Sequence, residues 1–368
     1  MNNRQRAMAI LNYENYDRLP LVHFAFWDET VWKWINEGHL TPEEGRDHDL
    51  VGHKLGFDFD WWANCVLPVH GMNPLFPPFK PEIVEELPDG SRKILDDYGA
   101  ITLQKSDATG IPHEFDHTLK DRKSWEKHYA HRLQFSPERV NPARMAQLKD
   151  DSTRDEPIGL YCGSLMGVIR NSLGIVGLSY LMADDEVLMD EIVNTFAEVC
   201  YRIVEYSLAS GAKFDFAHYW EDICYKNGPL ISPNFFRKKI GPHYRRISEL
   251  LWQYDIHIVS LDCDGKIDAL IPTWIENGVN TMFPMEVGTW KASIAPWREK
   301  FGREIRGVGG MDKKVFAYDY AAIDAEVERL KPLVDLGGYI PCPDHRIAPD
   351  AKWENVQYFC EKMRKVFG

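Results

Sequence analysis

The chain has 368 residues, and 43 lysines and arginines against 56 aspartates and glutamates give a net charge of −13. An apolar fraction of 44% excludes wholesale disorder, and so acidic a surface argues against nucleic acid or anionic membranes as partners. Seven scattered cysteines, with no secretory leader and no apolar run of membrane-spanning length, predict free thiols in a reducing, cytoplasmic location.

The first part of the chain predicts a helix over Arg4–Leu11 and a strand over Leu19–Phe26. Residues 57–102 then become rich in proline, glycine and aromatics with short alternating stretches, which is typical of short antiparallel strands. A polar linker follows at 136–156. We therefore expect one domain over residues 1–368, with 56–156 inserted into it.

After Pro157, short apolar runs alternate with helical stretches, of which Glu186–Ser207 is the clearest. Repeated strand–helix units indicate parallel strands joined by right-handed crossovers, and their number predicts a (β/α)8 TIM-type barrel. No Gly-x-Gly-x-x-Gly follows a strand, so a dinucleotide-binding fold lacks support. The runs are Ile158–Cys162, Lys213–Ala217, Ile256–Leu261, Val279–Phe283, Ile305–Val308 and Gly338–Pro341.

Polar side chains recur at the carboxyl ends of these predicted strands, where barrel enzymes carry their chemistry. Acidic helix caps, worth about 1 kcal/mol each, explain one or two of them. Several together favour a shared metal or ligand site, while a glycosidase carboxylate pair stays open. Nearby aromatic side chains either line this site or fill the core, with Trp32, Trp34 and Trp61 expected at its rim. They are Phe24, Trp27, Trp32, Trp34, Trp61 and Trp62. The polar residues concerned are His23, Glu221, Asp222, Asp262, Asp264, Glu286, Asp344 and His345.

Several motifs, in their order and spacing, resemble the uroporphyrinogen decarboxylase and cobamide-dependent methyltransferase superfamily. The resemblance covers nearly the whole chain except the region of the insertion, and it implies a (β/α)8 barrel. The motifs are Arg4–Leu11, Asp17–Pro20, Ile231–Phe236, Asp264–Gly265, Gly278–Asn280, Pro284–Glu286, Gly309–Lys313 and Gly337–Ile340.

Two activities divide this superfamily. Decarboxylases are similar to one another after the first strand, where arginines bind the carboxylates of the tetrapyrrole. The corresponding stretch here, His23–Glu29, contains no arginine and two acids. An octacarboxylate would meet repulsion there instead of bidentate hydrogen bonds, so this activity is the less favoured alternative.

The methyltransferase branch binds zinc through a His-x-Cys pair and a later cysteine. Anchored on Gly265, the resemblance places these ligands at Asp262, Asp264 and His345, with Glu221 as a further ligand or supporting acid. Cys263 and Cys342 lie within a few residues and stay open as replacements. Oxygen ligands suit the polarisation of an ether oxygen better than the activation of a thiol.

The resemblance therefore implies a zinc-assisted methyltransferase of the O-demethylase type. It would move a methyl group from a small methoxylated substrate, aromatic by preference, to the cobalt of a separate corrinoid protein. Asp222 and Glu286 are expected to contact substrate or orient a ligand, and His23 to donate a proton to the leaving oxygen. A non-catalytic barrel subunit is the remaining alternative, and a homodimer is left open.

Overall fold

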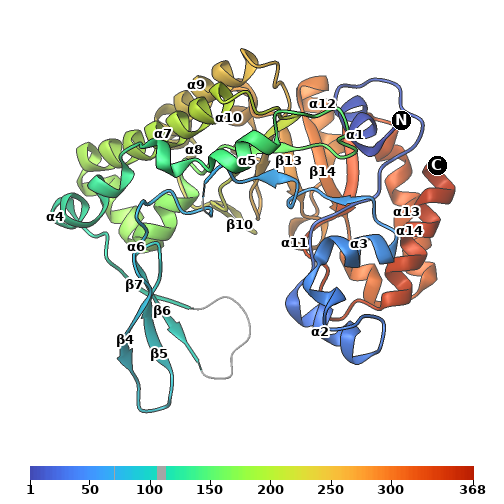
Figure 1. The fold of residues 1–368 in the computed structure, drawn as a ribbon, viewed down its shortest axis with the longest axis horizontal. Helices are drawn as coiled ribbons and strands as arrows, with labels where there is room; N and C mark the ends of the chain where they lie inside the picture. Colours follow the sequence, from blue (N-terminus) through green and yellow to red (C-terminus); the bar gives the residue numbers. More distant parts are fainter. Residues whose placement is uncertain (70, 106–112) are drawn as a thin grey trace.

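A parallel β-sheet forms the centre of the protein (Figure 1). The computed structural model describes residues 1–69, 71–105 and 113–368. Within these residues the sheet has seven strands in the order β15-β14-β13-β12-β9-β8-β3, and every neighbouring pair is parallel. The strands are β3 (Cys65–Val66), β8 (Gly159–Tyr161), β9 (Phe216–Trp220), β12 (Val259–Asp262), β13 (Thr281–Met285), β14 (Arg306–Met311) and β15 (Tyr339–Pro343).

The predicted α/β class and its parallel sheet are confirmed. Each of the six predicted runs after Pro157 overlaps a strand, and each strand begins slightly later than predicted. A further parallel pair, β1 (Val22–His23) with β2 (Phe59–Asp60), lies beside β15, where Phe26 bridges to Ile347. Since β2 and β3 both pair with parallel strands, the segment predicted as an insertion from residue 56 starts inside the parallel fold.

Short antiparallel strands follow, of which two lie inside the region predicted to hold them, residues 57–102, one crosses its end and one lies beyond it. These are β4 (Glu82–Glu86), β5 (Arg92–Leu95), β6 (Ala100–Gln104) and β7 (His113–His117), paired in chain order. Their sheet projects from the rest of the structure and contacts α6 (Gly167–Asp184) through β6 and β7 (Figure 1). A two-stranded antiparallel pair, β10 (Cys224–Tyr225) with β11 (Gly228–Pro229), follows β9.

The long helices follow the parallel strands. The predicted helix at Glu186–Ser207 is confirmed as α7 (Glu186–Ala209), which begins where the Asp185 side chain accepts a hydrogen bond from the Leu188 amide at 2.9 Å. The other helices are α1 (Asn3–Leu11), α2 (Asp28–Asn36), α3 (His48–Leu55), α4 (Arg122–Ser124), α5 (Pro142–Gln147), α6 (Gly167–Asp184), α8 (Pro233–Phe235), α9 (Gly241–Trp252), α10 (Ile271–Glu276), α11 (Val287–Trp290), α12 (Ile294–Phe301), α13 (Tyr320–Val334) and α14 (Trp353–Phe367).

Shorter 3₁₀ or π turns connect or extend these helices. They are η1 (Glu44–Arg46), η2 (Trp125–Tyr129), η3 (Ala130–Leu133), η4 (Pro137–Arg139), η5 (Phe236–Ile240), η6 (Gly302–Glu304) and η7 (Lys313–Ala317). All seven cysteines are free and buried, as predicted for core thiols. In the described part of the chain, no helix combines the length and apolarity that a membrane crossing requires.

Candidate acidic metal site and aromatic cavity

Three aspartates meet at the carboxyl ends of two neighbouring strands. Asp262 is the last residue of β12, Asp264 follows two residues later, and Asp222 lies two residues beyond β9. One carboxylate oxygen of each side chain lies within 4.8 Å of the other two. The structure therefore brings together two of the predicted metal ligands, Asp262 and Asp264, and adds Asp222, which the sequence assigned to substrate contact.

Two local turns fix this arrangement. Asp222 adopts a left-handed backbone with φ of 45°, and its Oδ1 accepts a hydrogen bond from the Asp264 amide at 2.9 Å. Gly265 has φ of 86°, and a Cβ there would lie 2.6 Å from the Cys224 carbonyl oxygen. Because of this φ and this close contact, only a residue without a side chain fits the turn. The Gly265 amide donates a hydrogen bond to Glu286 Oε2 at 2.5 Å.

Burial and mutual repulsion disfavour negative charge on all three aspartates at once. Burial, and then the neighbouring Asp264, raise the pKa of Asp222 to about 7. Burial and the charges of Asp222 and Asp264 raise the pKa of Asp262 well above its usual range. Asp264 Oδ1 is buried with no hydrogen-bond partner among the described residues. This donor set fits a divalent cation, because a positive ion offsets the repulsion and takes the unpaired oxygen.

His345 stands at the edge of this acidic cluster (Asp222, Asp262 and Asp264). Its Nε2 lies 3.4 Å from Asp264 Oδ2. Its ring stacks on Trp27 at 5.9 Å between centroids. The Arg346 guanidinium also lies over the Trp27 ring, 5.4 Å from its centroid. The predicted ligand His345 thus contacts one of the clustered carboxylates, Asp264, but does not belong to the three-residue group whose ligand atoms converge.

A cavity of about 410 Å³ opens directly onto the acidic cluster. Aromatic side chains form much of its wall, and carboxylates, His345 and Arg346 supply the polar part. A small ring-containing ligand suits such a mostly aromatic pocket with a few polar groups at one place. The lining residues are Phe24, Trp27, Trp62, Met72, Tyr98, Asn171, Trp220, Asp222, Asp262, Asp264, His345 and Arg346.

The structure does not bring Glu221 into the cluster, which contradicts its predicted role as a metal ligand. Its carboxylate accepts hydrogen bonds at the start of α6 from the amides of Leu165, Met166 and Gly167 at 2.8, 2.9 and 2.7 Å. Ser164 Oγ at 3.1 Å and the Tyr244 hydroxyl also donate to it. Burial raises the pKa of Glu221, and these hydrogen bonds oppose the rise. The carboxylate therefore anchors the helix N-terminus.

His23 is also misplaced as a proton donor to a ligand in the cavity. It is 1% exposed, packs between Phe26 and Phe57, and lies against α3, where a Cβ on Gly52 would be 2.5 Å from its Nε2. Burial lowers its pKa, although Asp60, 3.4 Å from Nδ1, acts in the opposite direction. The adjacent Phe24, and not His23, lines the cavity.

Glu286 lies beside the acidic cluster without belonging to it. It is buried beside the acidic cluster and accepts hydrogen bonds from Gly265 N and from Thr289 Oγ1 at 2.8 Å. Burial, and then the charge of Asp264, raise its pKa. It holds the turn that carries Asp264, which agrees with the expected orienting role and leaves substrate contact untested.

The alternative cysteine ligands and the expected tryptophan rim do not reach the cavity. Cys263 and Cys342 are buried at 1% and 0% exposure, and burial raises both thiol pKa values well above the usual range. Trp34 and Trp61 are fully buried, and only Trp32 is exposed. Trp62 lines the cavity, as do Phe24 and Trp27, in agreement with the sequence analysis. Sequence reasoning did not assign Trp220, Tyr98 or Asn171 to the wall.

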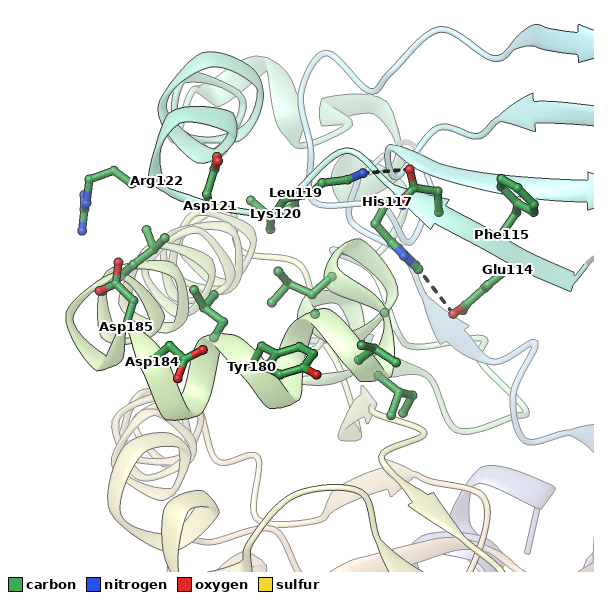
Figure 2. A pocket seen from close by; sticks show the side chains of 18 residues that line it. Glu114, Phe115, His117, Leu119, Lys120, Asp121, Arg122, Tyr180, Asp184 and Asp185 are labelled. Carbon is green, nitrogen blue, oxygen red and sulfur yellow. Dashed lines mark hydrogen bonds and ion pairs between the residues drawn. The ribbon is translucent and has the colours of Figure 1, made fainter.

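A second cavity, of about 660 Å³, lies away from the acidic cluster between β7 and α6 (Figure 2). Its charged groups are paired with each other in part: Lys120 with Asp116 at 2.8 Å, and His117 with Glu114 at 3.6 Å. None of the residues that the sequence singles out lines it. The candidate site is therefore the smaller, aromatic cavity.

The family of the chain follows from comparison with known proteins. The uroporphyrinogen decarboxylase (URO-D) family matches residues 164–366, and the chain belongs to this family, which confirms the superfamily inferred from its motifs. No curated protein matches it.

A solved structure shares its fold at low sequence identity, and a second one is similar to a lesser degree. A methyltransferase from Methanosarcina mazei is 17% identical with a TM-score of 0.63, over 100% of this chain and 99% of that one. A B12-independent methionine synthase from Shewanella sp. W3-18-1, in complex with selenomethionine, is 13% identical with a TM-score of 0.44, over 95% and 99%.

Proposed function

We propose that this protein is a methyltransferase that moves a methyl group from a methoxylated aromatic compound to the cobalt of a separate corrinoid protein. The carrying observation is the acidic cluster, which opens onto an aromatic cavity. In this reaction the cobalt(I) electron pair attacks the methyl carbon, the carbon–oxygen bond breaks, and the aryl oxygen leaves with the bonding pair as a phenolate. The chain needs no nucleophile of its own.

The cavity wall supports a ring-containing substrate. Trp27, Trp62 and Trp220 present flat apolar surfaces, and offset or edge-on packing against a bound ring contributes about 0.5–1.5 kcal/mol per contact beyond area burial. A substrate placed against them lies beside the carboxylates of Asp222 and Asp262.

We further propose that Asp222, Asp262 and Asp264 hold a divalent cation, zinc as first expected, with His345 as supporting group or additional ligand. When bound, such an ion polarises the ether oxygen and offsets the charge of the departing phenolate. Glu286 and the Gly265 turn fix Asp264, and the Asp264 amide fixes Asp222. Trp27, stacked on His345, keeps that ring at the cavity edge.

We also propose that the parallel strands close into a barrel. The β1–β2 pair lies beside β15 through the Phe26–Ile347 bridge, and β2 leads within a few residues into β3 at the other edge of the sheet. These contacts support closure into a (β/α)8 barrel with strands β4 to β7 as an appended sheet. The acidic cluster would then lie at its carboxyl-terminal mouth.

The decarboxylase alternative is less well supported by the cavity. Its lining includes three carboxylates and, among the described residues, one arginine, Arg346. A substrate with many carboxylates would be repelled by the acids and would find few bidentate partners.

The test is methyl transfer from methoxybenzenes to cob(I)alamin, followed by the absorbance of methylcobalamin. The wild type should transfer methyl groups, and Asp262→Asn should lose at least about 100-fold in rate. Tight porphyrin binding without transfer would favour the decarboxylase, and neither activity would favour a non-catalytic subunit.

A further inference from the structure

A layer of polar side chains lies directly beneath the aromatic cavity. His218 and Trp220 alternate along β9 and so share one face of the sheet, and Trp220 lines the cavity. Strand register places Tyr161 of β8 and Ser260 of β12 beside His218. These three side chains therefore form the next level inward from the cavity wall.

Two members of this layer lack hydrogen-bond partners. Within the described parts of the chain, neither ring nitrogen of His218 nor the Tyr161 hydroxyl has one, although the residues are only 0% and 3% exposed. Ser260 Oγ, in contrast, accepts from Trp61 Nε1 at 3.4 Å. Burying an unpaired polar group costs about 1–3 kcal/mol, so a bound ligand group or an ordered water is needed to satisfy these atoms.

Both residues contact the cavity wall from behind. The His218 ring makes an edge-on contact with Trp62 at 4.9 Å and with Phe283 at 5.9 Å, and the Tyr161 ring lies 6.3 Å from Trp62. Trp62 lines the cavity, and Phe283 packs on the lining residue Phe24 at 4.7 Å. The unpaired atoms thus lie immediately behind the aromatic wall, covered by Trp62, and are not themselves part of the cavity lining.

The chemistry of the layer selects a neutral partner. Burial lowers the pKa of His218 to about 3, so the imidazole is neutral, with one nitrogen that donates and one that accepts. Burial raises the pKa of Tyr161 well above its usual range, so its hydroxyl stays protonated. A group that donates and accepts at once, such as a hydroxyl, satisfies this pair, whereas a carboxylate would be placed near Asp262 without a compensating charge.

We propose that His218 and Tyr161 are specificity-determining residues that hydrogen-bond a hydroxyl substituent of the aromatic ether that reaches past Trp62. This inference rests on the proposed function, which supplies the methoxylated aromatic ring that carries the hydroxyl. It assigns the two residues to binding, with no part in the transfer step.

The test is direct binding of methoxybenzene and of the 2-, 3- and 4-methoxyphenols, without corrinoid, by quenching of tryptophan fluorescence. At least one methoxyphenol should bind the wild type about tenfold more tightly than methoxybenzene, as one hydrogen bond allows. His218→Phe should abolish this preference, and Tyr161→Phe should reduce it.

Tyr219→Phe is the matched control. Its hydroxyl is also buried without a partner among described residues, but it faces the opposite side of β9 and packs on Tyr244 at 5.0 Å. The preference should survive in this variant. Thermal melts show folding, and His218→Phe should melt no lower than the wild type because it removes unpaired buried atoms.

Equal wild-type affinity for all four compounds, or no binding of any, would overturn the inference and leave water as the partner of these atoms. Survival of the preference in His218→Phe and Tyr161→Phe would overturn it as well. A preference that these substitutions remove, in a protein that transfers no methyl group, supports this inference and refutes the proposed function.

Discussion

Replacing Glu221 with glutamine should destabilise the protein while leaving the acidic cluster able to bind its metal. Both carboxylate oxygens are in use: one accepts from Leu165 N and the Tyr244 hydroxyl, the other from Met166 N, Gly167 N and a serine. A glutamine retains one acceptor oxygen and turns an NH₂ group toward donors. At least one buried amide then loses its partner.

The magnitude follows from these contacts. A lost hydrogen bond to a charged group costs about 1.5–3 kcal/mol. Because burial raises the pKa of Glu221, its negative charge adds no further stabilisation that glutamine would remove. An unfolding entropy of about 2.1 cal/mol/K per residue gives about 0.8 kcal/mol/K for this chain, so Tm should fall by about 2–4 °C.

Calorimetry and zinc titration of Glu221→Gln check this reasoning. Glu14→Gln, at an exposed glutamate, is the control and should change stability by less than about 0.5 kcal/mol. A Glu221→Gln variant that melts like the wild type would refute the anchoring role. One that keeps its Tm but loses metal would restore Glu221 as a ligand.

Three further outcomes are expected. Burial raises the folded-state pKa of Asp222 from 3.8 to about 7. In EDTA, the contribution of this group to stability is therefore present below about pH 4 and is lost as pH rises through 7. Asp222→Asn should flatten that part of the Tm–pH curve, and an unchanged curve would contradict this assignment. Gly167→Ala should lower Tm, since its Cβ would lie 2.0 Å from the Glu221 carbonyl oxygen, whereas Gly177→Ala on the same helix, with its nearest heavy atom at 3.8 Å, should not. Trp220→Leu should weaken 4-methoxyphenol binding about tenfold by fluorescence titration, and unaltered binding would remove this wall from the site.

Much of the site could be predicted from the sequence because parallel strands gather their carboxyl ends at one edge. The acids after β9 and β12 therefore had to be neighbours. What the prediction lacked was the alternation of side chains along each strand. Trp220 and Asp222 face the cavity, whereas Glu221 between them faces α6. In the same way, Asp262 and Asp264 face the cavity, and Cys263 between them does not.

The same alternation separates Phe24, which lines the cavity, from His23, which does not. Polar residues on the cavity face also make the strand ends hard to predict. The apolar run Lys213–Ala217 predicts a strand that ends before His218, whereas β9 continues to Trp220. Contributions from distant segments, such as Tyr98 near the antiparallel sheet and Asn171 on α6, depend on tertiary packing that no local pattern encodes.

The metal content of the purified protein tests the central claim most directly. Mass spectrometry of the wild type, after equilibration with buffered zinc and removal of free ions, should give about one ion per chain. Asp262→Asn should give none, because it removes one of three converging carboxylates. A wild type without bound metal, or an Asp262→Asn variant that binds as much as the wild type, would contradict the account.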